Sequence, residues 1–269
     1  MGLGYRSVLH ESIVEHQNEI DWVEVTTDHF IDAAEAFDKL REIAGLFPVV
    51  PHSLEMSIGS GGGLDMEYLR QVKKVADAVD APWASDHLCF TREDGIELGS
   101  LTPVQRTRSH ARHVARKAQQ VQDELGRRFL MENITYYVEL PGQLTEAEFI
   151  TEVMEHCECG ILLDLTNALI NAHNHGSDPY EFVDGLPLER VEQVHLAGSL
   201  PVDNPYDLQI DGHNARLGDD VLQLLDHLLE RQPVKGILLE RDDEFPDDFG
   251  EILQDLERAR RTAARWSGS

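Results

Sequence analysis

The sequence predicts a single domain, covering residues 1–269, that folds as an α/β protein of the (β/α)8 TIM-barrel class. Short β-like apolar runs alternate with amphipathic helical stretches from end to end, which is typical of a parallel sheet built from βα units. Eight such runs are present, the number that a closed barrel needs. No Pro- or Ser-rich linker, low-complexity tract or clear internal repeat divides the chain.

The eight strands are expected where short apolar runs are bounded by turn residues. They cover residues 2–6, 21–26, 48–52, 83–88, 129–133, 160–165, 191–196 and 235–240. Helical patterns with apolar residues at three- and four-residue spacing cover residues 64–79, 103–125, 145–157, 219–231 and 247–266. Helical crossovers between eight strands favour a closed barrel, although an open parallel sheet has the same strand count.

Local signals indicate where two helices begin and how one loop behaves. Asp65 stands at an N-cap position, and Thr145 is followed three residues later by Glu148, as in a capping box. The glycine-rich segment 59–63 follows the third strand and is expected to be a flexible loop. It lacks the Lys-Ser or Lys-Thr pair of a phosphate-binding P-loop, so that interpretation is rejected.

The charge balance of the chain excludes two classes of partner. Fifty Asp and Glu residues outnumber 23 Lys and Arg residues, and the formal net charge is −27. Such a field repels nucleic-acid phosphates and anionic lipid, so neither nucleic acid nor membrane is expected as a partner. No apolar run approaches the roughly 18 residues that cross a bilayer, and the N-terminal residues lack the pattern of a signal peptide.

The cationic residues and the cysteines indicate the environment of the protein. Five of the 23 cationic residues are lysines. An acidic surface poor in Lys is expected of a salt-adapted, halophilic protein, because concentrated salt screens like charges; an ordinary acidic protein is the alternative. Three cysteines, an odd number in a large chain, fit buried thiols in a reducing compartment. We therefore expect a cytoplasmic protein.

Potential metal ligands stand at the ends of six successive predicted strands. In chain order they are His52, His87, Glu132, Asp164, His195 and Glu240. The carboxyl ends of barrel strands converge on one mouth, where barrel enzymes place their active sites. We therefore expect six imidazole or carboxylate groups to share one small volume.

Buried carboxylates in such a cluster require cations. No Lys or Arg stands among these residues before Arg241, so bound metal ions are the simplest source of positive charge. Asn167, one turn beyond the sixth strand, and Asp211 and His213, after the seventh, are further candidates. Nine candidate ligands exceed what one ion needs, so we expect a carboxylate to bridge two ions, and Glu132 is the expected bridge.

The residue types alone leave the metal and the catalytic base open. A single His or Glu at a strand end is more often a hydrogen-bonded or solvated group, and it is the joint placement that favours metal binding. Mixed imidazole and carboxylate ligands suit Fe(II), Mn(II) and Zn(II) alike. His175, in a loop expected beyond the sixth strand, and Glu55 are candidates for a catalytic base.

Short motifs in a fixed order over nearly the whole chain resemble a known family. They are GLGYR (residues 2–6), WVEV (22–25), HSLEMSIG (52–59), SDHL (85–88), EN (132–133), LLDLTN (162–167), NHG (174–176), HLAG (195–198), IDGH (210–213) and LERD (239–242). In this order they resemble the multinuclear non-haem iron-dependent oxidative enzymes, formerly a domain of unknown function. That family lies within the xylose-isomerase-like TIM-barrel superfamily and includes methanobactin-biosynthesis enzymes.

The resemblance implies a barrel that binds two or three iron ions and uses O2 to oxidise or rearrange residues, often Cys, in small ribosomally made precursor peptides. Members of the family frequently act with a partner protein that presents the peptide, so the resemblance makes such a partner a candidate here. Zinc or manganese in the purified protein is compatible with the same ligands. The ligands implied for three ions are His52, His87 and Glu132; Glu132, Asp164, His195 and Glu240; and Asn167, Asp211 and His213.

The chain departs from the family's pattern at three positions. Asp86 stands where Glu is common, Ser199 where His is common, and Arg241 where Trp is common. These departures bear on the identity of the substrate more than on metal binding.

Other classes of function stay open. The same ligand order occurs in metal-dependent sugar or sugar-phosphate isomerases and in trinuclear zinc endonucleases of abasic DNA. The endonucleases have His at the position of Asn167, and they need a basic DNA surface, whereas this chain is strongly acidic. A metal-binding scaffold without catalysis, whose acidic surface recruits a partner, would show tight metal content and no turnover.

Overall fold

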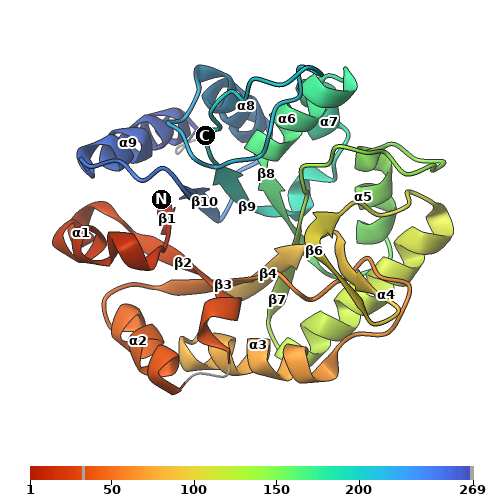
Figure 1. Cartoon of the computed structure of the whole chain (residues 1–269), viewed down its shortest axis with the longest axis horizontal. Helices are drawn as coiled ribbons and strands as arrows, with labels where there is room; N and C mark the ends of the chain where they lie inside the picture. Colours follow the sequence, from red (N-terminus) through yellow and green to blue (C-terminus); the bar gives the residue numbers. More distant parts are fainter. Residues whose placement is uncertain (32–33, 267–269) are drawn as a thin grey trace.

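The computed structural model describes residues 1–31 and 34–266. In this part of the chain, eight parallel strands close into a barrel in the order β1-β10-β9-β8-β7-β4-β3-β2 (Figure 1). The prediction of a closed barrel rather than an open sheet is confirmed. The barrel strands are β1 (Gly2–Gly4), β2 (Trp22–Thr26), β3 (Val49–Ser53), β4 (Trp83–His87), β7 (Arg128–Glu132), β8 (Gly160–Asp164), β9 (Val191–Leu196) and β10 (Gly236–Leu239).

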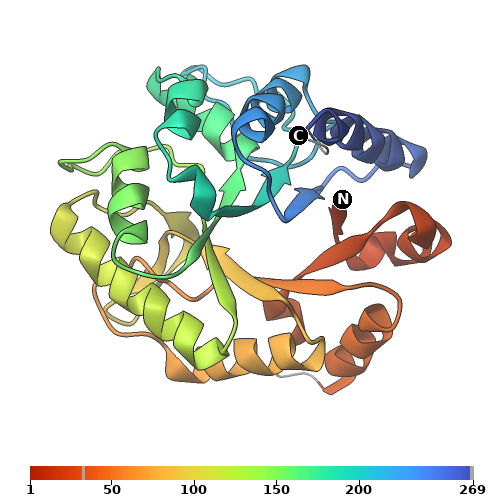
Figure 2. The ribbon, with the colours of Figure 1, turned by 180° about the vertical axis from the view of Figure 1, so that it is seen from behind.

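The helices surround the barrel, as the views from the two sides show (Figures 1 and 2). They are α1 (His10–Glu15), α2 (Ala34–Ala44), α3 (Met66–Ala78), α4 (Arg108–Leu125), α5 (Glu146–Met154), α6 (Leu165–His175), α7 (Pro179–Asp184), α8 (Asp219–Arg231) and α9 (Gly250–Ala264). Short 3-10 helices cover η1 (Ser7–Leu9), η2 (Gln17–Glu19), η3 (Thr27–Phe30) and η4 (Leu188–Arg190). Because helices cover the outer face, strands such as β8 and β9 are buried along their whole length.

Side-chain caps decide where several helices begin. Asp65 accepts hydrogen bonds from two backbone N–H groups of α3, and Thr145 and Glu148 form the predicted capping box at α5. The predicted helix over residues 103–125 corresponds to α4, and its predicted start at residue 103 is wrong. Residues 103–107 are irregular, and the Thr107 side chain caps α4 by accepting from the backbone N–H of His110.

Two tryptophans fill the end of the barrel opposite the mouth. The rings of Trp22 on β2 and Trp83 on β4 meet edge to face at 6.3 Å. Gly2 leaves room for this packing, because a Cβ there would lie 2.4 Å from the Trp22 ring. Trp83 Nε1 donates across the barrel to Gln193 Oε1 on β9 at 2.6 Å. The interior is therefore a packed core that supports the groups above it.

A hairpin that the sequence analysis did not predict follows β4. Its strands, β5 (Phe90–Glu93) and β6 (Ile96–Thr102), pair antiparallel. The turn residues Asp94 and Gly95 have φ angles of 48° and 77°, and an Asp-Gly pair with two positive φ values is a preferred two-residue hairpin turn. The hairpin leaves the barrel on the side where the strands end (Figure 1).

Two further expectations concern helices and thiols. Within residues 1–31 and 34–266, no helix has the length and apolar character needed to cross a membrane. All three cysteines are buried free thiols, as predicted.

Candidate metal centre

The structure brings the strand-end residues together inside the mouth of the barrel. Five of them close or lie near the end of successive strands, β3, β4, β7, β8 and β9, and Glu240 directly follows β10. All six are buried: His52, His87, Glu132, Asp164, His195 and Glu240. Four groups of three ligand atoms converge among these residues and their neighbours, in positions where each group could hold an ion.

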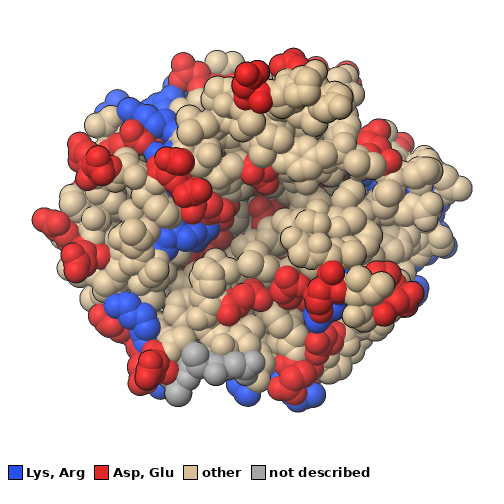
Figure 3. Space-filling model, in the orientation of Figure 1, with Lys and Arg blue, Asp and Glu red and all other residues tan. Residues whose placement is uncertain are grey.

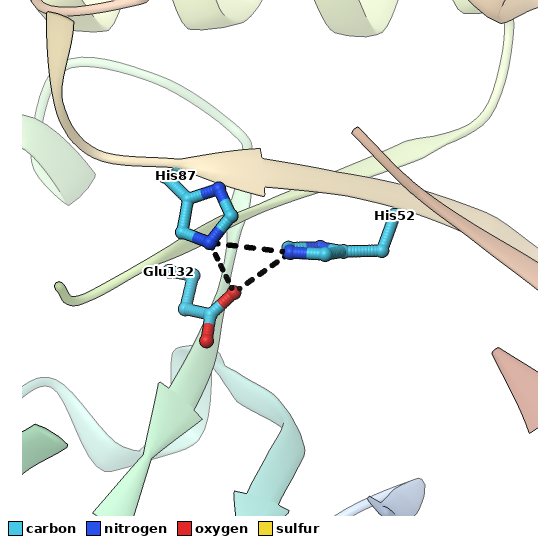
Figure 4. Close-up of side chains that lie close together, drawn as sticks. All are labelled: His52, His87 and Glu132. Atoms are coloured by element: carbon cyan, nitrogen blue, oxygen red, sulfur yellow. Dashed lines mark hydrogen bonds and ion pairs between the residues drawn. The ribbon is translucent and has the colours of Figure 1, made fainter. Parts of the chain in front are cut away.

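The first group is formed by His52, His87 and Glu132 (Figure 4). Glu132 Oε2 lies 3.1 Å from His52 Nε2 and 3.5 Å from His87 Nε2, and the two nitrogens are 3.3 Å apart. Ligands about 2.1 Å from one ion, at angles of roughly 90–109°, are about 3.0–3.4 Å apart. The Ser85 hydroxyl contacts His52 Nδ1 at 2.8 Å and so orients the ring with Nε2 inward.

The second group joins Glu132 to Asp164 and His195. The other oxygen of Glu132, Oε1, lies 3.2 Å from His195 Nδ1. Glu132 therefore directs one oxygen to each of two groups, which is the arrangement of a bridging carboxylate. The Asn167 backbone N–H donates to Asp164 Oδ1 at 2.7 Å, so Asp164 turns Oδ2 toward the cluster.

A third group lies nearer the surface and consists of Asp164, His213 and Glu240. His213 Nδ1 is 3.1 Å from Glu240 Oε2, and His213 Nε2 is 2.9 Å from Asp211 Oδ1. His213 has a φ of 42°, in the left-handed region that few residues other than glycine adopt. Its carbonyl accepts from the backbone N–H of Asp242 at 2.7 Å, so a strained loop is tied to β10 where it delivers an imidazole.

Glu24 on β2 is a buried residue of the centre that sequence reasoning missed. It forms a fourth group with His195 and Glu240. Glu24 Oε1 lies 3.0 Å from His195 Nε2, and Gln193 Nε2 donates to Glu24 Oε2 at 2.6 Å. A carboxylate that accepts the outer N–H of a ligating imidazole fixes its tautomer and orientation. Glu24 therefore leaves His195 Nδ1 free to face Glu132 and Glu240.

Arg6 corrects the expectation that no cation stands near the cluster before Arg241. From the end of β1 its guanidinium donates to Glu240 Oε1 at 3.0 Å and also pairs with Asp242. Arg241 instead turns to Glu251, at 2.5 Å. The sequence did not indicate this because Arg6 lies 234 residues from Glu240, and barrel closure brings β1 beside β10.

Several buried polar atoms of the cluster have no hydrogen-bond partner. Among the described residues, Glu132 Oε2, Asp164 Oδ2, His195 Nδ1 and His213 Nε2 are buried without a hydrogen-bond partner, although each lies 2.9–3.6 Å from another ligand atom of the cluster. Each buried polar atom without a partner costs roughly 1–3 kcal/mol. Their concentration in one mouth fits a site for cations, because lone pairs aimed at a common point are satisfied by a shared ion.

The pKa values in the cluster also reflect the shortage of positive charge around its buried carboxylates. Burial raises the pKa of Glu132 to about 7 and that of Asp164 to about 8. Burial opposes the charging of His195, but Glu24, Glu132 and Glu240 outweigh it and hold the pKa of His195 well above its usual value. Burial lowers the pKa of His87 to about 4. Protons thus stand in for positive charge, and metal ions bind such sites by displacing protons.

Asn167 lies at the start of α6, next to the cluster. Its side-chain oxygen accepts from the Thr135 hydroxyl at 2.6 Å, and its amide nitrogen donates to the Asn133 carbonyl at 3.1 Å. These bonds fix the side chain, and the sp2 oxygen keeps a second lone pair.

The two candidate bases lie outside the four groups of converging atoms. His175 ends α6 rather than lying in a loop, because the helical pattern continues to the left-handed cap at Gly176. Its ring stacks on Tyr136 at 4.6 Å. Glu55 faces a cleft that Tyr68 and Arg92 also line, and its Oε2 is buried without a hydrogen-bond partner among the described residues.

Comparison with known proteins identifies the family. A family model described as the RiPP precursor modification enzyme MbnB/TglH/ChrH matches residues 1–264. The chain belongs to this family. RiPP precursors are ribosomally made peptides, and enzymes of this family modify them. A UPF0276 protein from Caulobacter vibrioides is 35% identical to this chain over 272 residues. The match covers 99% of this chain and 94% of the relative.

Several solved structures resemble this chain in fold. A xylose isomerase domain protein from Planctomyces limnophilus superposes with a TM-score of 0.62 at 16% identity, covering 98% of each chain. Endonuclease IV from Thermus thermophilus superposes with a TM-score of 0.57 at 19% identity, covering 98% of this chain and all of the other. The fold is therefore the xylose-isomerase-like TIM barrel, as predicted, and these likenesses concern the fold alone.

Proposed function

We propose that this member of the family is a multinuclear non-haem iron enzyme, which uses O2 to oxidise or rearrange a Cys residue of a ribosomally made precursor peptide. The observation that carries the proposal is the convergence of unsatisfied buried nitrogen and oxygen atoms on common points in the barrel mouth. Imidazole and carboxylate donors in this mixture suit Fe(II). Family membership supports the peptide as the substrate.

The proposed ligand sets are supported most directly for the first two ions, whose ligands include two of the converging groups. His52, His87 and Glu132 hold the first ion, whose three ligand atoms lie 3.1–3.5 Å apart. Glu132 would bridge to a second ion, which Asp164, His195 and Glu240 would also hold. A third ion would be held by His213, Asp211 and Asn167; of these, His213 belongs to a group of converging atoms and Asp211 Oδ1 lies 2.9 Å from His213 Nε2. Bound iron would supply the one-electron chemistry with O2 that side chains lack.

The remaining residues of the centre orient these ligands. Glu24 holds His195 by its outer nitrogen, and Gln193 anchors Glu24 to the floor of the barrel through Trp83. Arg6 holds Glu240 by Oε1, so that Oε2 faces His195 and His213. Such a rigid support keeps the ligand atoms within the narrow tolerance that metal sites require.

The test is a single-turnover reaction. Protein purified without oxygen is loaded with Fe(II), mixed with a short Cys-containing peptide sought among the products of the neighbouring genes, and exposed to O2. We expect O2 uptake together with a change in peptide mass, and loss of both in Glu132→Gln. A mass change that is indifferent to O2 and supported by Zn(II) or Mn(II) would instead indicate hydrolase or isomerase chemistry. Tight metal content without any reaction would indicate a binding scaffold.

A further inference from the structure

The hairpin after β4 presents a strand edge that the rest of the described chain leaves uncovered. Among the described strands, β6 pairs with β5 alone, in a sheet separate from the barrel. Residues 96–100 of β6 are all exposed, and the side chains of Ile96 and Leu98 are 65% and 41% exposed. An exposed edge with apolar side chains is a template on which another extended chain adds as a strand.

The position of this edge links the surface to the metal centre. Phe90, which opens β5, comes three residues after His87 and so lies within about 10 Å of it. Thr102 pairs with Phe90, so the last residue of β6 lies near the mouth. Ile96, six residues away along β6, lies about 20 Å further out. A chain added to β6 therefore extends from the outside of the molecule to the edge of the mouth.

The charges of the hairpin are mostly acidic. Glu93, Asp94 and Glu97 stand at its outer end, and the Glu97 side chain is 67% exposed. Arg92 is occupied by Asp65 at 3.2 Å and by the Glu55 carbonyl at 2.7 Å. On the same face, Asp and Glu side chains gather in and around a hollow near its centre (Figure 3). An occupant with Lys or Arg side chains matches this charge.

Apolar side chains continue along the neighbouring rim. The loop after β7 exposes Tyr137, Val138 and Leu140, which are 44%, 64% and 37% exposed. This loop and the hairpin follow neighbouring barrel strands, because β4 pairs with β7. Exposed apolar groups concentrated on one rim mark an interaction surface.

We propose that β6 is the docking edge for the peptide substrate, and that the docked segment is an extended chain with alternating apolar and Lys or Arg side chains. The segment adds to the hairpin as a further strand and places the chain that continues from it at the barrel mouth. The proposal rests on the proposed function for the identity of its occupant. Docking itself needs neither metal nor O2, so it is measured separately.

The test uses metal-free protein and two fluorescein-labelled twelve-residue peptides, one alternating Leu and Lys and one alternating Leu and Glu. Fluorescence anisotropy gives the affinity of each. We expect the Leu-Lys peptide to bind and the Leu-Glu peptide not to bind. Leu98→Lys should weaken binding at least tenfold. Leu46→Lys is the matched control, because Leu46 is also 41% exposed but lies in the loop before β3, at the opposite end of the barrel.

A third peptide separates strand addition from simple attraction between charges. A Leu-Lys peptide with alternate backbone nitrogens methylated keeps its side chains but loses strand hydrogen bonds, and we expect it to bind at least tenfold more weakly. Equal affinity of the methylated peptide, equal loss in both Lys variants, or no binding to the wild type overturns the proposal. So does a wild-type dimer in sedimentation that Leu98→Lys dissociates, because a second copy would then occupy β6.

Discussion

Glu24 illustrates how a carboxylate can support the proposed metal centre by holding a proposed ligand, His195, from behind. Its two oxygens are occupied by His195 at 3.0 Å and by Gln193 at 2.6 Å. The charge on Glu24 therefore acts through the imidazole, raising its basicity and fixing which nitrogen faces the cluster.

Replacement of Glu24 tests this role. We expect Glu24→Gln to weaken Fe(II) or Mn(II) binding about 10–100-fold, because the neutral amide stabilises the ligating form of His195 less well. Isothermal titration under anaerobic conditions measures the affinity. The matched control is Glu192→Gln. Like Glu24, Glu192 is a buried carboxylate of the barrel, but it lies on β9 and pairs with Arg128 and Lys235 at the other end of the barrel. Equal affinity of Glu24→Gln and wild type would contradict the assignment.

Glu146 is a half-buried carboxyl away from the candidate metal centre, with a side chain that is 17% exposed, and its pKa leads to a pH-dependent stability. Burial raises the pKa of Glu146 from 4.5 to about 7, against the attraction of Arg106. The folded protein thus holds this proton more tightly than the unfolded chain. Stability from this group is present below pH 4.5 and is lost as the pH rises to about 7, at a cost of up to about 3 kcal/mol.

We therefore expect Glu146→Gln to melt at a higher temperature than wild type at pH 8 and at nearly the same temperature at pH 5. The reason is that Gln removes the cost of a buried charge that exists only at the higher pH. Calorimetric scans of both proteins at the two pH values measure the difference. A difference that does not change between pH 5 and pH 8 would show that Glu146 titrates normally.

The residues of the proposed metal centre differ in how well the sequence predicts that they lie there. His52, Glu132 and Asp164 could be predicted because each stands at the end of an apolar run, and barrel topology brings such ends together. Glu24 lies inside a strand, and Arg6 lies beyond the first strand. Their roles depend on contacts across the barrel to His195 and Glu240, which no local pattern indicates.

At the scale of elements, α4 anchors the loop after β3 through one buried lysine. Lys117 Nζ donates to the Ser60 hydroxyl at 2.7 Å and to the carbonyls of Ser57 and Ser60, each at 3.1 Å. Burial lowers the pKa of Lys117 to about 8. The same loop contacts the hairpin, where the backbone N–H of Gly61 donates to Glu93 at 2.8 Å.

We expect Lys117→Met to lower the free energy of unfolding by about 2–4 kcal/mol, because buried carbonyls lose their donor. Amide hydrogen exchange in residues 57–63 should quicken at the same time. Chemical denaturation and exchange mass spectrometry measure the two effects. Lys73→Met is the control, since Lys73 also donates to a carbonyl, that of Leu125, but is 40% exposed. Unchanged exchange in the loop would show that α4 does not hold it.

The strands also show which parts of the fold a hydrophobic sequence pattern predicts and which parts it misses. The eight barrel strands follow from apolar runs, because burial on both faces makes each run continuous. The hairpin β5–β6 was missed because only one of its eleven strand residues, Thr91, is buried, so its strands carry no core pattern. Its signal was the Asp94-Gly95 turn, which sequence reasoning could have used.

At the scale of the whole molecule, the net charge of −27 sets the response to salt. Asp and Glu side chains are spread over the face that contains the mouth (Figure 3). Repulsion among them opposes the compact state, and salt screens it. The charge therefore predicts that the folded state gains stability as the ionic strength rises.

We expect the melting temperature at pH 7.5 to rise by roughly 5–10 °C between 0.1 M and 2 M KCl, as screening recovers a few kcal/mol. The rise should shrink at pH 5, where protonation reduces the negative charge. Scanning calorimetry in both buffers provides the comparison. A melting temperature that does not increase with KCl would favour an ordinary acidic protein over a salt-adapted one.

The metal content of the intact protein tests the central claim most directly. Protein purified without oxygen is loaded with Fe(II), desalted and analysed for metals, beside Glu132→Gln and the control Glu192→Gln. We predict two or three ions per chain in wild type and control. We predict at most one in Glu132→Gln, because Glu132 belongs to two of the converging groups. Wild-type protein without bound metal, or equal content in wild type and Glu132→Gln, would contradict the claim.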